Sequence, residues 1–276
     1  MKRGNVMSVL KELSCEGFRL SHSFDKAPRE RDFEPHIHDD YELFCLVRGS
    51  VDYMVEGKLY RLHSGAVMLM RSSETHNLIV NKSTEYERYV LNFKPSFVLE
   101  NGFSREILAP YRERGLGERN MYLPEELEGI SPIPYLERAF TQGAHLDART
   151  VALSTLSALL CEINVAFKSK SEPQGSQNQA EQELIAYVNE NLTTELTIDD
   201  IARHFHMSAS QVSRIFKRAT LTSVHNYIIT KRLILFNKKI AKGVGVIEAC
   251  HECGFRDYSA FYRLYKKRYG KSPAKK

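Results

Sequence analysis

The segments SRIFKR, at residues 213–218, and YRLYKK, at residues 262–267, are two copies of one pattern. Each copy has an Arg, an aliphatic residue, an aromatic residue and two basic residues in the same order, and the copies lie 49 residues apart. Upstream, Ala202 matches Ala249 at an offset of 47, so the second copy has a turn that is two residues longer. The sequence therefore predicts one helical unit that occurs twice.

Each copy has the residues that a helix-turn-helix needs. The small Ala202 or Ala249 lets two helices approach closely, and the apolar Val212 or Phe261 fixes the second helix against the first. The outward faces of the two second helices are predicted to carry Ser210, Ser213, Arg214 and Lys217 in the first copy and Tyr258, Ser259, Tyr262, Arg263 and Lys266 in the second. Because Arg binds guanine bidentately and Ser or Tyr contacts bases or phosphates, the predicted partner is double-stranded DNA.

A single helix-turn-helix pattern is a weak signal, because helical hairpins are common. Two copies in tandem, joined by a long helix predicted at residues 224–241, favour DNA binding over a helical protein-interaction domain. Capping residues support the predicted helix starts, since Thr197 with Asp200 and Ser208 with Gln211 have the spacing of N-terminal capping boxes.

Positive charge is concentrated in the same part of the chain. Residues 177–276 contain 17 Lys and Arg against 9 Asp and Glu, whereas residues 1–176 contain 22 against 25. The overall charge of +5 thus hides a basic C-terminal part and a slightly acidic remainder. This asymmetry directs the search for a polyanionic partner to the last hundred residues.

The rest of the chain has a different character. Residues 168–180, KSKSEPQGSQNQA, are polar and predict a linker. Residues 132–167 have apolar side chains three to four positions apart, which predicts a helix that packs on the preceding domain or pairs with a second subunit. Before residue 97, six short segments predict the strands of a small antiparallel barrel or sandwich, namely YELFCLVRG, VDYMVEG, KLYRL, AVMLM, HNLIV and EYERYVLNF.

The stretch HIHDDYEL, at residues 36–43, resembles the first motif of cupin barrels through His36, His38 and Glu42. His76 has the fourth ligand position of the second cupin motif, although the Pro and the second Gly of that motif are absent. Residues two apart on a strand face the same side, so both early histidines are expected to face the barrel interior. Three imidazoles and a carboxylate suit iron, manganese or zinc, and a hydrogen-bonding role without metal is the alternative.

Composition argues against several other classes of protein. No continuous apolar run approaches the roughly 18 residues of a membrane span, and the basic N-terminus lacks the apolar segment of a secretory signal. The five cysteines are scattered, which fits a reducing cytosol. Cys250 and Cys253 have no second pair at zinc-ribbon spacing and are predicted to be buried structural residues. We therefore expect a cytoplasmic protein without a membrane partner.

Residues 254–273, GFRDYSAFYRLYKKRYGKSP, closely resemble the signature of the AraC/XylS family of bacterial transcription regulators. The resemblance covers about residues 180–276 and implies two recognition helices in successive major grooves on one face of DNA. It places base-facing positions at Ser210, Ser213, Arg214, Tyr258, Ser259, Tyr262 and Arg263. Two departures concern helix ends: Leu221 stands where the family usually has Gly, and Arg256 stands where a capping Ser is frequent, which leaves Asp257 as the cap.

The sensor domains of that family resemble cupins and generally bind a small effector, commonly a sugar, without a catalytic metal. The resemblance thus favours an effector pocket over a metal centre at the cupin-like motif. We expect no cofactor and no catalytic residue. The candidate effector-binding residues are His36, His38, Tyr41, Glu42, Tyr53, Arg71 and His76, of which His36, His38, Glu42 and His76 are also the candidate metal ligands.

The predicted fold has two domains, a cupin-like antiparallel β-barrel with C-terminal helices and an all-α domain of two helix-turn-helix motifs joined by a long helix. The expected boundaries are an effector-binding domain at 1–130, a helical dimerisation or packing segment at 131–167, a linker at 168–180 and the DNA-binding domain at 181–276. The favoured function is a sugar-responsive activator that acts as a homodimer and contacts RNA polymerase. Two alternatives stay open, a cupin metalloenzyme (a dioxygenase or sugar isomerase) with an appended DNA-binding module and a ligand-independent regulator that acts through a protein partner.

Overall fold

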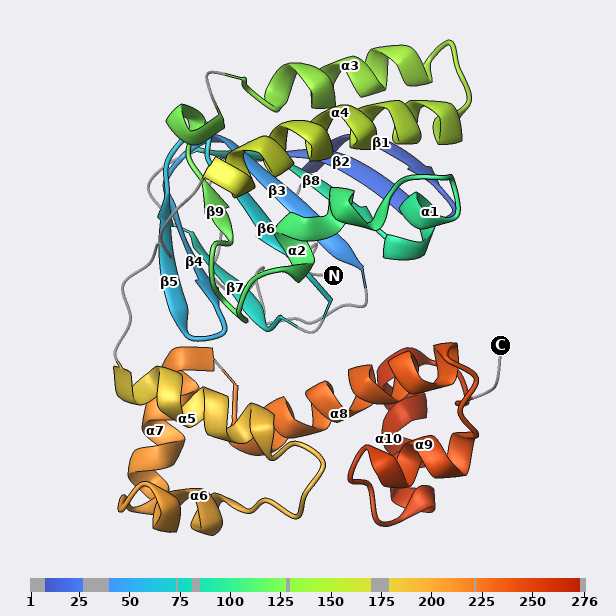
Figure 1. Ribbon diagram of the computed structural model, residues 1–276. Coiled ribbons are helices and arrows are strands. Elements are labelled where there is room, and N and C mark those ends of the chain that lie inside the picture. The colour runs from blue at the N-terminus through green and yellow to red at the C-terminus, as the bar shows by residue number, and fades with distance from the viewer. Residues whose placement is uncertain are drawn as a thin grey trace, which may run out of the picture. The chain divides into compact units, whose positions relative to one another are not determined.

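Figure 1 shows the computed structural model, which describes residues 8–26, 40–72, 74–80, 85–127, 130–169, 179–220 and 222–273. The chain divides into two compact units, Met1–Ser176 and Gln177–Lys276. The division falls inside the predicted linker at 168–180, of which residues 170–178 lie outside the described ranges. Each unit has its own buried core.

The first unit contains two antiparallel sheets (Figure 1). The strand order is β1-β2-β8-β3-β6-β9 in the larger sheet and β5-β4-β7 in the smaller one. The strands are β1 (Ser8–Cys15), β2 (Phe18–Asp25), β3 (Tyr41–Arg48), β4 (Val51–Val55), β5 (Lys58–Leu62), β6 (Val67–Met70), β7 (His76–Val80), β8 (Tyr86–Phe93) and β9 (Met121–Tyr122). The six strands expected from the sequence correspond to β3 through β8, which confirms the antiparallel N-terminal fold.

The sequence did not predict β1, β2 or β9. β1 and β2 form a hairpin whose turn contains Gly17, at a φ of +83° that glycine adopts without strain. β9 has two residues and pairs with β6 through Tyr122 and Met121. A strand of this length has no periodic pattern to detect, so its position is decided by tertiary packing.

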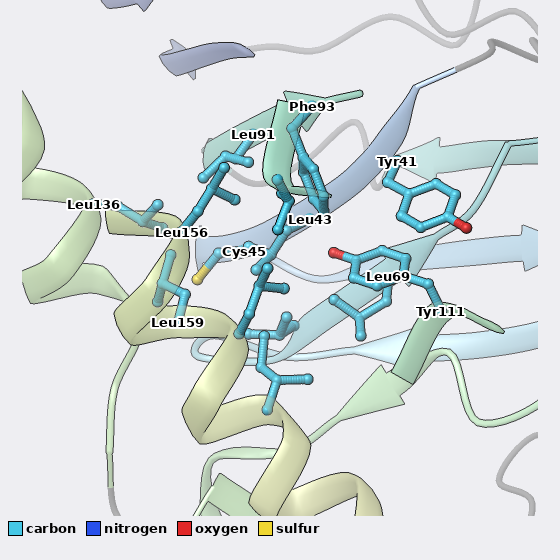
Figure 2. Packing of buried hydrophobic residues seen from close by; sticks show 14 of the residues in the cluster. Tyr41, Leu43, Cys45, Leu69, Leu91, Phe93, Tyr111, Leu136, Leu156 and Leu159 are labelled. Carbon is cyan, nitrogen blue, oxygen red and sulfur yellow. The ribbon is translucent and has the colours of Figure 1, made fainter. Parts of the chain in front are cut away.

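In the described ranges of the first unit, α1 (Pro95–Leu99) and α2 (Ala109–Arg112) lie between β8 and β9, and α3 (Ile133–Gly143) and α4 (Ala148–Ser169) follow β9. α3 and α4 cover one face of the larger sheet (Figure 1). Figure 2 shows Leu43 and Cys45 of β3 directed toward this layer, where Leu156 and Leu159 of α4 contribute to the same buried cluster. The other face of the larger sheet packs on the smaller sheet, with Phe44 of β3 in that second cluster.

α4 corrects the expectation that no segment is apolar enough to span a membrane. It is 22 residues long and has a mean hydropathy of 1.6 over an 18-residue window, so it passes that test by length and composition alone. Its role in the fold explains the composition, because α4 is the central helix of the first core. The apolar face expected from the sequence is buried against the sheet and comprises Ala152, Leu156, Leu159, Leu160, Ile163 and Phe167.

The described part of the second unit is helical. Its helices are α5 (Gln179–Glu190), α6 (Ile198–His204), α7 (Ala209–Thr220), α8 (Val224–Ala241), α9 (Val246–Glu252) and α10 (Tyr258–Tyr269). The bounds predicted for the long connecting helix are confirmed by α8. α6 with α7 and α9 with α10 form the two predicted helix pairs, and α8 joins them (Figure 1).

Candidate DNA-binding surface and effector site

The first helix-turn-helix consists of α6 and α7. Thr197 caps α6, because its side chain accepts a hydrogen bond from the Asp200 amide while the Asp200 carboxylate accepts one from the Thr197 amide. Ser208 and Gln211 make the equivalent pair of bonds before α7, at 2.9 and 3.2 Å. Both caps occur where the sequence predicted them, so the starts of the two helices are fixed by local side chains.

The two helices pack through the residues that the repeat identified. Ala202 of α6 and Val212 of α7 are buried, and Phe216 of α7 is fully buried against the ring of Tyr227 on α8. These three positions occupy one face of the helix pair. The opposite face of α7 is left to solvent, and it exposes Ser210, Ser213, Arg214 and Lys217.

The second helix-turn-helix repeats this arrangement with α9 and α10. Ala249 and Phe261 are buried at the matching positions. Asp257 caps α10 by accepting a hydrogen bond from the Ser259 amide at 2.7 Å, as the sequence suggested. On α10, Ser259, Arg263 and Lys266 are exposed, whereas Tyr258 and Tyr262 are half-buried with their rings 6.3 Å apart.

The arginines on the two helix pairs differ in their surroundings. In the described part of the chain, neither Arg214 nor Arg263 takes part in a hydrogen bond or ion pair. By contrast, Arg218 binds Glu181, and the exposed Arg203 pairs with Asp200 at 3.1 Å. Arg214 and Arg263 thus occupy equivalent places on α7 and α10 and keep their guanidinium donors available for an external acceptor.

The C-x-x-C pair lies in the core of the second unit. Cys250 and Cys253 are both fully buried, and burial raises the pKa of both thiols, in the case of Cys253 to about 11. A thiol that is both buried and protonated is a poor nucleophile and a poor metal ligand. The geometry therefore fits the structural role expected from the sequence.

Three of the candidate effector residues lie together between the two sheets. Tyr53 of β4 donates a hydrogen bond from its hydroxyl to Glu42 Oε1 of β3 at 3.1 Å, and the ring centroids of Tyr53 and His76 are 6.0 Å apart. All three side chains are buried. Burial, together with the Glu42 carboxylate, raises the pKa of Tyr53 well above its ordinary range, so this hydroxyl acts as a donor.

Strand β8 adds residues to this cluster that the sequence interpretation missed. Asn92 donates to Glu42 Oε2 at 3.0 Å, and the Arg88 guanidinium lies 4.7 Å from the ring centroid of Tyr86. Tyr86, Arg88 and Asn92 are separated by even numbers of residues, so the period of a strand puts them on one face. That alternation was the signal in EYERYVLNF that would have identified them.

Tyr41 and Arg71 do not join the cluster. Tyr41 precedes Glu42 on β3 and therefore faces the opposite side of the sheet, where its ring stacks on Tyr111 with centroids 4.7 Å apart (Figure 2). Arg71 donates from Nη1 to the backbone carbonyls of Tyr111 and Arg114 at 3.2 and 3.1 Å. These contacts place Arg71 at the C-terminal end of α2, where it satisfies carbonyl groups that the helix leaves open.

Four residues are candidate metal ligands from the cupin-like motif. His36 and His38 lie outside the described residues, and Glu42 and His76 are the two candidates inside them. The His76 Nδ1–H donates to the carbonyl oxygen of Glu74 at 2.9 Å, and Glu42 is bonded to Tyr53 and Asn92. Within the described ranges, no three His, Cys, Asp or Glu side chains gather as a metal site would require.

Comparisons with known proteins agree with this two-part architecture. Residues 24–149 match the model of the AraC-like ligand binding domain, and residues 201–275 match that of a helix-turn-helix domain. The HTH-type transcriptional activator RhaS of Shigella dysenteriae serotype 1 is 22% identical over 258 residues, covering 88% of this chain and 87% of the relative. RhaS of Escherichia coli strain K12 has the same identity and coverage.

Among solved structures, wild-type ToxT from Vibrio cholerae strain SCE256 with a bound unsaturated fatty acid superposes with a TM-score of 0.42 and 16% identity, covering 96% of this chain and 95% of that one. The RhaS relatives are transcriptional activators, which argues against the alternative of a cupin metalloenzyme. The chain therefore belongs to the AraC family of ligand-responsive transcription regulators, with an AraC-like ligand-binding domain followed by a helix-turn-helix DNA-binding domain.

Proposed function

We propose that α7 and α10 are both recognition helices and that they enter successive major grooves on one face of DNA. The observation that carries this proposal is the equivalent placement of Arg214 and Arg263, both exposed and both without a protein partner in the described part of the chain. Each Arg reads a guanine through its two-pronged donor geometry. The remaining contacts come from Ser210, Ser213, Tyr258, Ser259 and Tyr262 to bases or phosphates and from Lys217 and Lys266 to phosphates.

Hydroxyl-radical footprinting tests this arrangement on DNA that the full-length protein enriches from a randomised duplex pool. Two protected patches are expected on one face of the duplex, about 10 base pairs apart. Arg214→Ala should remove base-specific protection from one patch and Arg263→Ala from the other, because each residue belongs to a different helix pair. A single patch, or the same loss from both variants, would contradict the proposal.

For the first unit, we propose that the space between the two sheets binds a small carbohydrate effector. The buried Glu42 and Tyr53 and the half-buried Asn92 form a hydrogen-bonded network there, and His76 and Arg88 add further buried polar groups. Specific recognition of a polar ligand needs a few placed polar groups within an apolar and aromatic wall, which the surrounding residues provide. His36 and His38, which lie outside the described residues, stay candidates from their sequence position before Glu42, whereas Tyr41 and Arg71 do not belong to the proposed site.

A panel of neutral sugars tests this proposal through the melting temperature of the full-length protein. A binding sugar should raise the melting temperature, and Tyr53→Phe or Glu42→Gln should reduce that rise at the same sugar concentration. Arg61→Ala is the matched control, because Arg61 is exposed on β5. A rise that survives both pocket substitutions would exclude this site, and no rise with any sugar would favour regulation through a protein partner.

We further propose that the protein is a cytoplasmic activator that works as a homodimer with RNA polymerase. The relative RhaS is named a transcriptional activator and aligns over 88% of the chain, which supports activation. The face of α4 that points away from the sheet leaves Val165 49% exposed, which supports a helix that meets a second subunit. We propose that residues 1–130 form the effector-binding domain and residues 131–167 the helical dimerisation or packing segment. Residues 168–180 are then the linker and residues 181–276 the DNA-binding domain. Light scattering with and without a binding sugar measures the oligomeric state, and a monomer under both conditions would contradict the dimer.

A further inference from the structure

The two helix-turn-helix pairs have separate buried cores. One core holds Phe216 and the N-terminal part of α8 through Tyr227, and the other holds Phe261 and the C-terminal part of α8 through Phe236. A cleft of about 680 Å³ lies between the pairs, with Thr193 on one side and Phe255 on the other among its lining residues. The relative position of α7 and α10 therefore depends on α8 and on the contacts that cross this cleft.

Arg232 of α8 makes such contacts with both sides. Its Nε donates to the carbonyl of Leu192 at 2.6 Å and its Nη2 to the carbonyl of Thr194 at 2.7 Å, both in the connection between α5 and α6. Its Nη1 donates to the carbonyl of Gly254 at 2.8 Å, in the turn between α9 and α10. One rigid guanidinium thus links the segment that leads into α6, the first helix of the first helix-turn-helix, to the turn of the second.

Gly254 shows how closely the two sides approach. A Cβ atom at this position would lie 2.8 Å from the carbonyl oxygen of Thr193 and 3.0 Å from Cζ of Arg232, and the residue has a φ of +82°. Both features require glycine. Next to this contact, Arg256 forms an ion pair with Glu195, again between the α9–α10 turn and the α5–α6 connection.

We propose that Arg232 is a positioning residue that sets the spacing and angle between the recognition helices α7 and α10, with the Glu195–Arg256 pair in a supporting role. The proposal rests on the proposed function, in which both helices read the same DNA. A fixed geometry lets the second helix dock without a further ordering cost once the first has docked. Without Arg232, each helix pair still folds and binds its own groove, but the two no longer favour one separation.

The test uses three duplexes derived from DNA that the full-length wild-type protein enriches from a randomised pool. The first has both half-elements at the selected spacing, the second has two extra base pairs between them, and the third has one half-element replaced. Arg232→Ala should weaken binding to the first duplex by roughly tenfold and shrink the preference for the first over the second by a similar factor. Binding to the third duplex should stay within about twofold of wild type.

Two further variants separate geometry from charge and folding. Arg232→Lys keeps the charge but donates from a single nitrogen, which cannot reach three carbonyls that are bonded by three different nitrogens of the guanidinium, so it should lose the spacing preference as well. Glu195→Gln removes a negative charge, and this alone would tighten DNA binding. The variant should nevertheless weaken the spacing preference, because it breaks the ion pair with Arg256. The effect should be smaller than that of Arg232→Lys, since the Glu195–Arg256 pair is exposed. If circular dichroism shows that Arg232→Ala does not fold, the test relies on Arg232→Lys and Glu195→Gln.

An unchanged spacing preference in the folded variants would overturn the inference, and so would an equal loss of affinity on all three duplexes. Arg214→Ala, measured in parallel, separates this result from failure of the proposed function. If Arg214→Ala weakens binding while the Arg232 variants keep the wild-type spacing preference, only the positioning role is wrong. If Arg214→Ala has no effect, the recognition helices themselves are wrongly assigned.

Discussion

Glu74 and Arg114 form a fully buried ion pair in the first unit. Oε1 of Glu74 lies 2.6 Å from Nη1 of Arg114 and Oε2 lies 2.8 Å from Nη2, with both side chains inaccessible to solvent. The Gly117 amide and the Asn120 side chain donate to the same carboxylate. The pair thereby ties the connection between β6 and β7 to the segment that follows α2, next to the carbonyl that accepts from His76.

Removing one member of this pair should destabilise the first unit strongly. Arg114→Met leaves the Glu74 carboxylate buried without its partner, and we expect a loss of about 3–5 kcal/mol in the free energy of unfolding, measured by urea titration. Arg48→Ala is the matched control, because the Arg48–Glu85 pair is exposed and should contribute little. A loss from Arg114→Met no larger than that from Arg48→Ala would show that the buried pair is not important for stability.

The same pair predicts a pH dependence of stability. Burial alone would raise the pKa of Glu74, but the Arg114 guanidinium and the nearby Arg71 together outweigh this effect and hold the pKa below its ordinary value of 4.5. Because the pKa is lower in the folded than in the unfolded state, the stabilisation is complete above about pH 4.5 and is lost as pH falls through the folded pKa. The melting temperature of the wild type should therefore fall more steeply below pH 4.5 than that of Glu74→Gln. If the melting temperatures of the two proteins fall equally with pH, Glu74 is not the source of the pH dependence.

The cap at Thr197 should contribute measurably to the stability of the second unit. Thr197→Ala removes the acceptor for the Asp200 amide at the start of α6, and the expected loss is about 1 kcal/mol. Denaturant unfolding monitored by helical circular dichroism measures it. Thr230→Ala on α8 serves as comparison, because the Thr230 hydroxyl donates to the carbonyl of Asn226 within its own helix and caps no helix end. An equal loss from both variants would contradict the capping role.

The cysteines should react with a thiol reagent in a fixed order. Cys161 is exposed on α4, whereas Cys45, Cys250 and Cys253 are fully buried. Burial raises the pKa of Cys45 to about 12 and that of Cys253 to about 11, so little thiolate forms there at pH 8. We expect a fast phase in native protein that disappears in Cys161→Ser, with the buried thiols reacting only after unfolding. Fast labelling of Cys250 or Cys253 would revive a redox interpretation of the C-x-x-C pair.

The sequence predicted the second unit more completely than the first because local signals specify its parts. Each of these signals determines structure within a few residues of its own position. They are the repeated helix pattern, the caps at Thr197 and Ser208, and the small residues Ala202 and Ala249. Helix periodicity and capping are short-range features, so the bounds of α8 and the exposed face of α7 follow from them. Arg232 was missed because its three acceptors lie 22 to 40 residues away along the chain.

The effector site was harder to predict because its members depend on long-range strand pairing. Glu42 and Asn92 are 50 residues apart and meet only because β3 pairs with β8. Tyr41 has the type of a pocket residue, an aromatic ring with a hydroxyl, but it is adjacent to Glu42 on β3, and adjacent residues of a strand face opposite sides. Arg71 resembled a pocket residue by type, but its donors are used by carbonyls at the end of α2, which no local pattern indicates.

The most direct measurement of the central claim is the affinity of Arg214→Ala, Arg263→Ala and the double variant for DNA enriched by the wild-type protein. Arg203→Ala is the matched control, because Arg203 is exposed on α6 and is paired with Asp200. Each single substitution on α7 or α10 should cost about 1–3 kcal/mol of binding free energy and relax sequence preference at one position, and the two losses should add in the double variant. If both single variants bind as tightly and as selectively as Arg203→Ala, α7 and α10 are not the helices that read DNA.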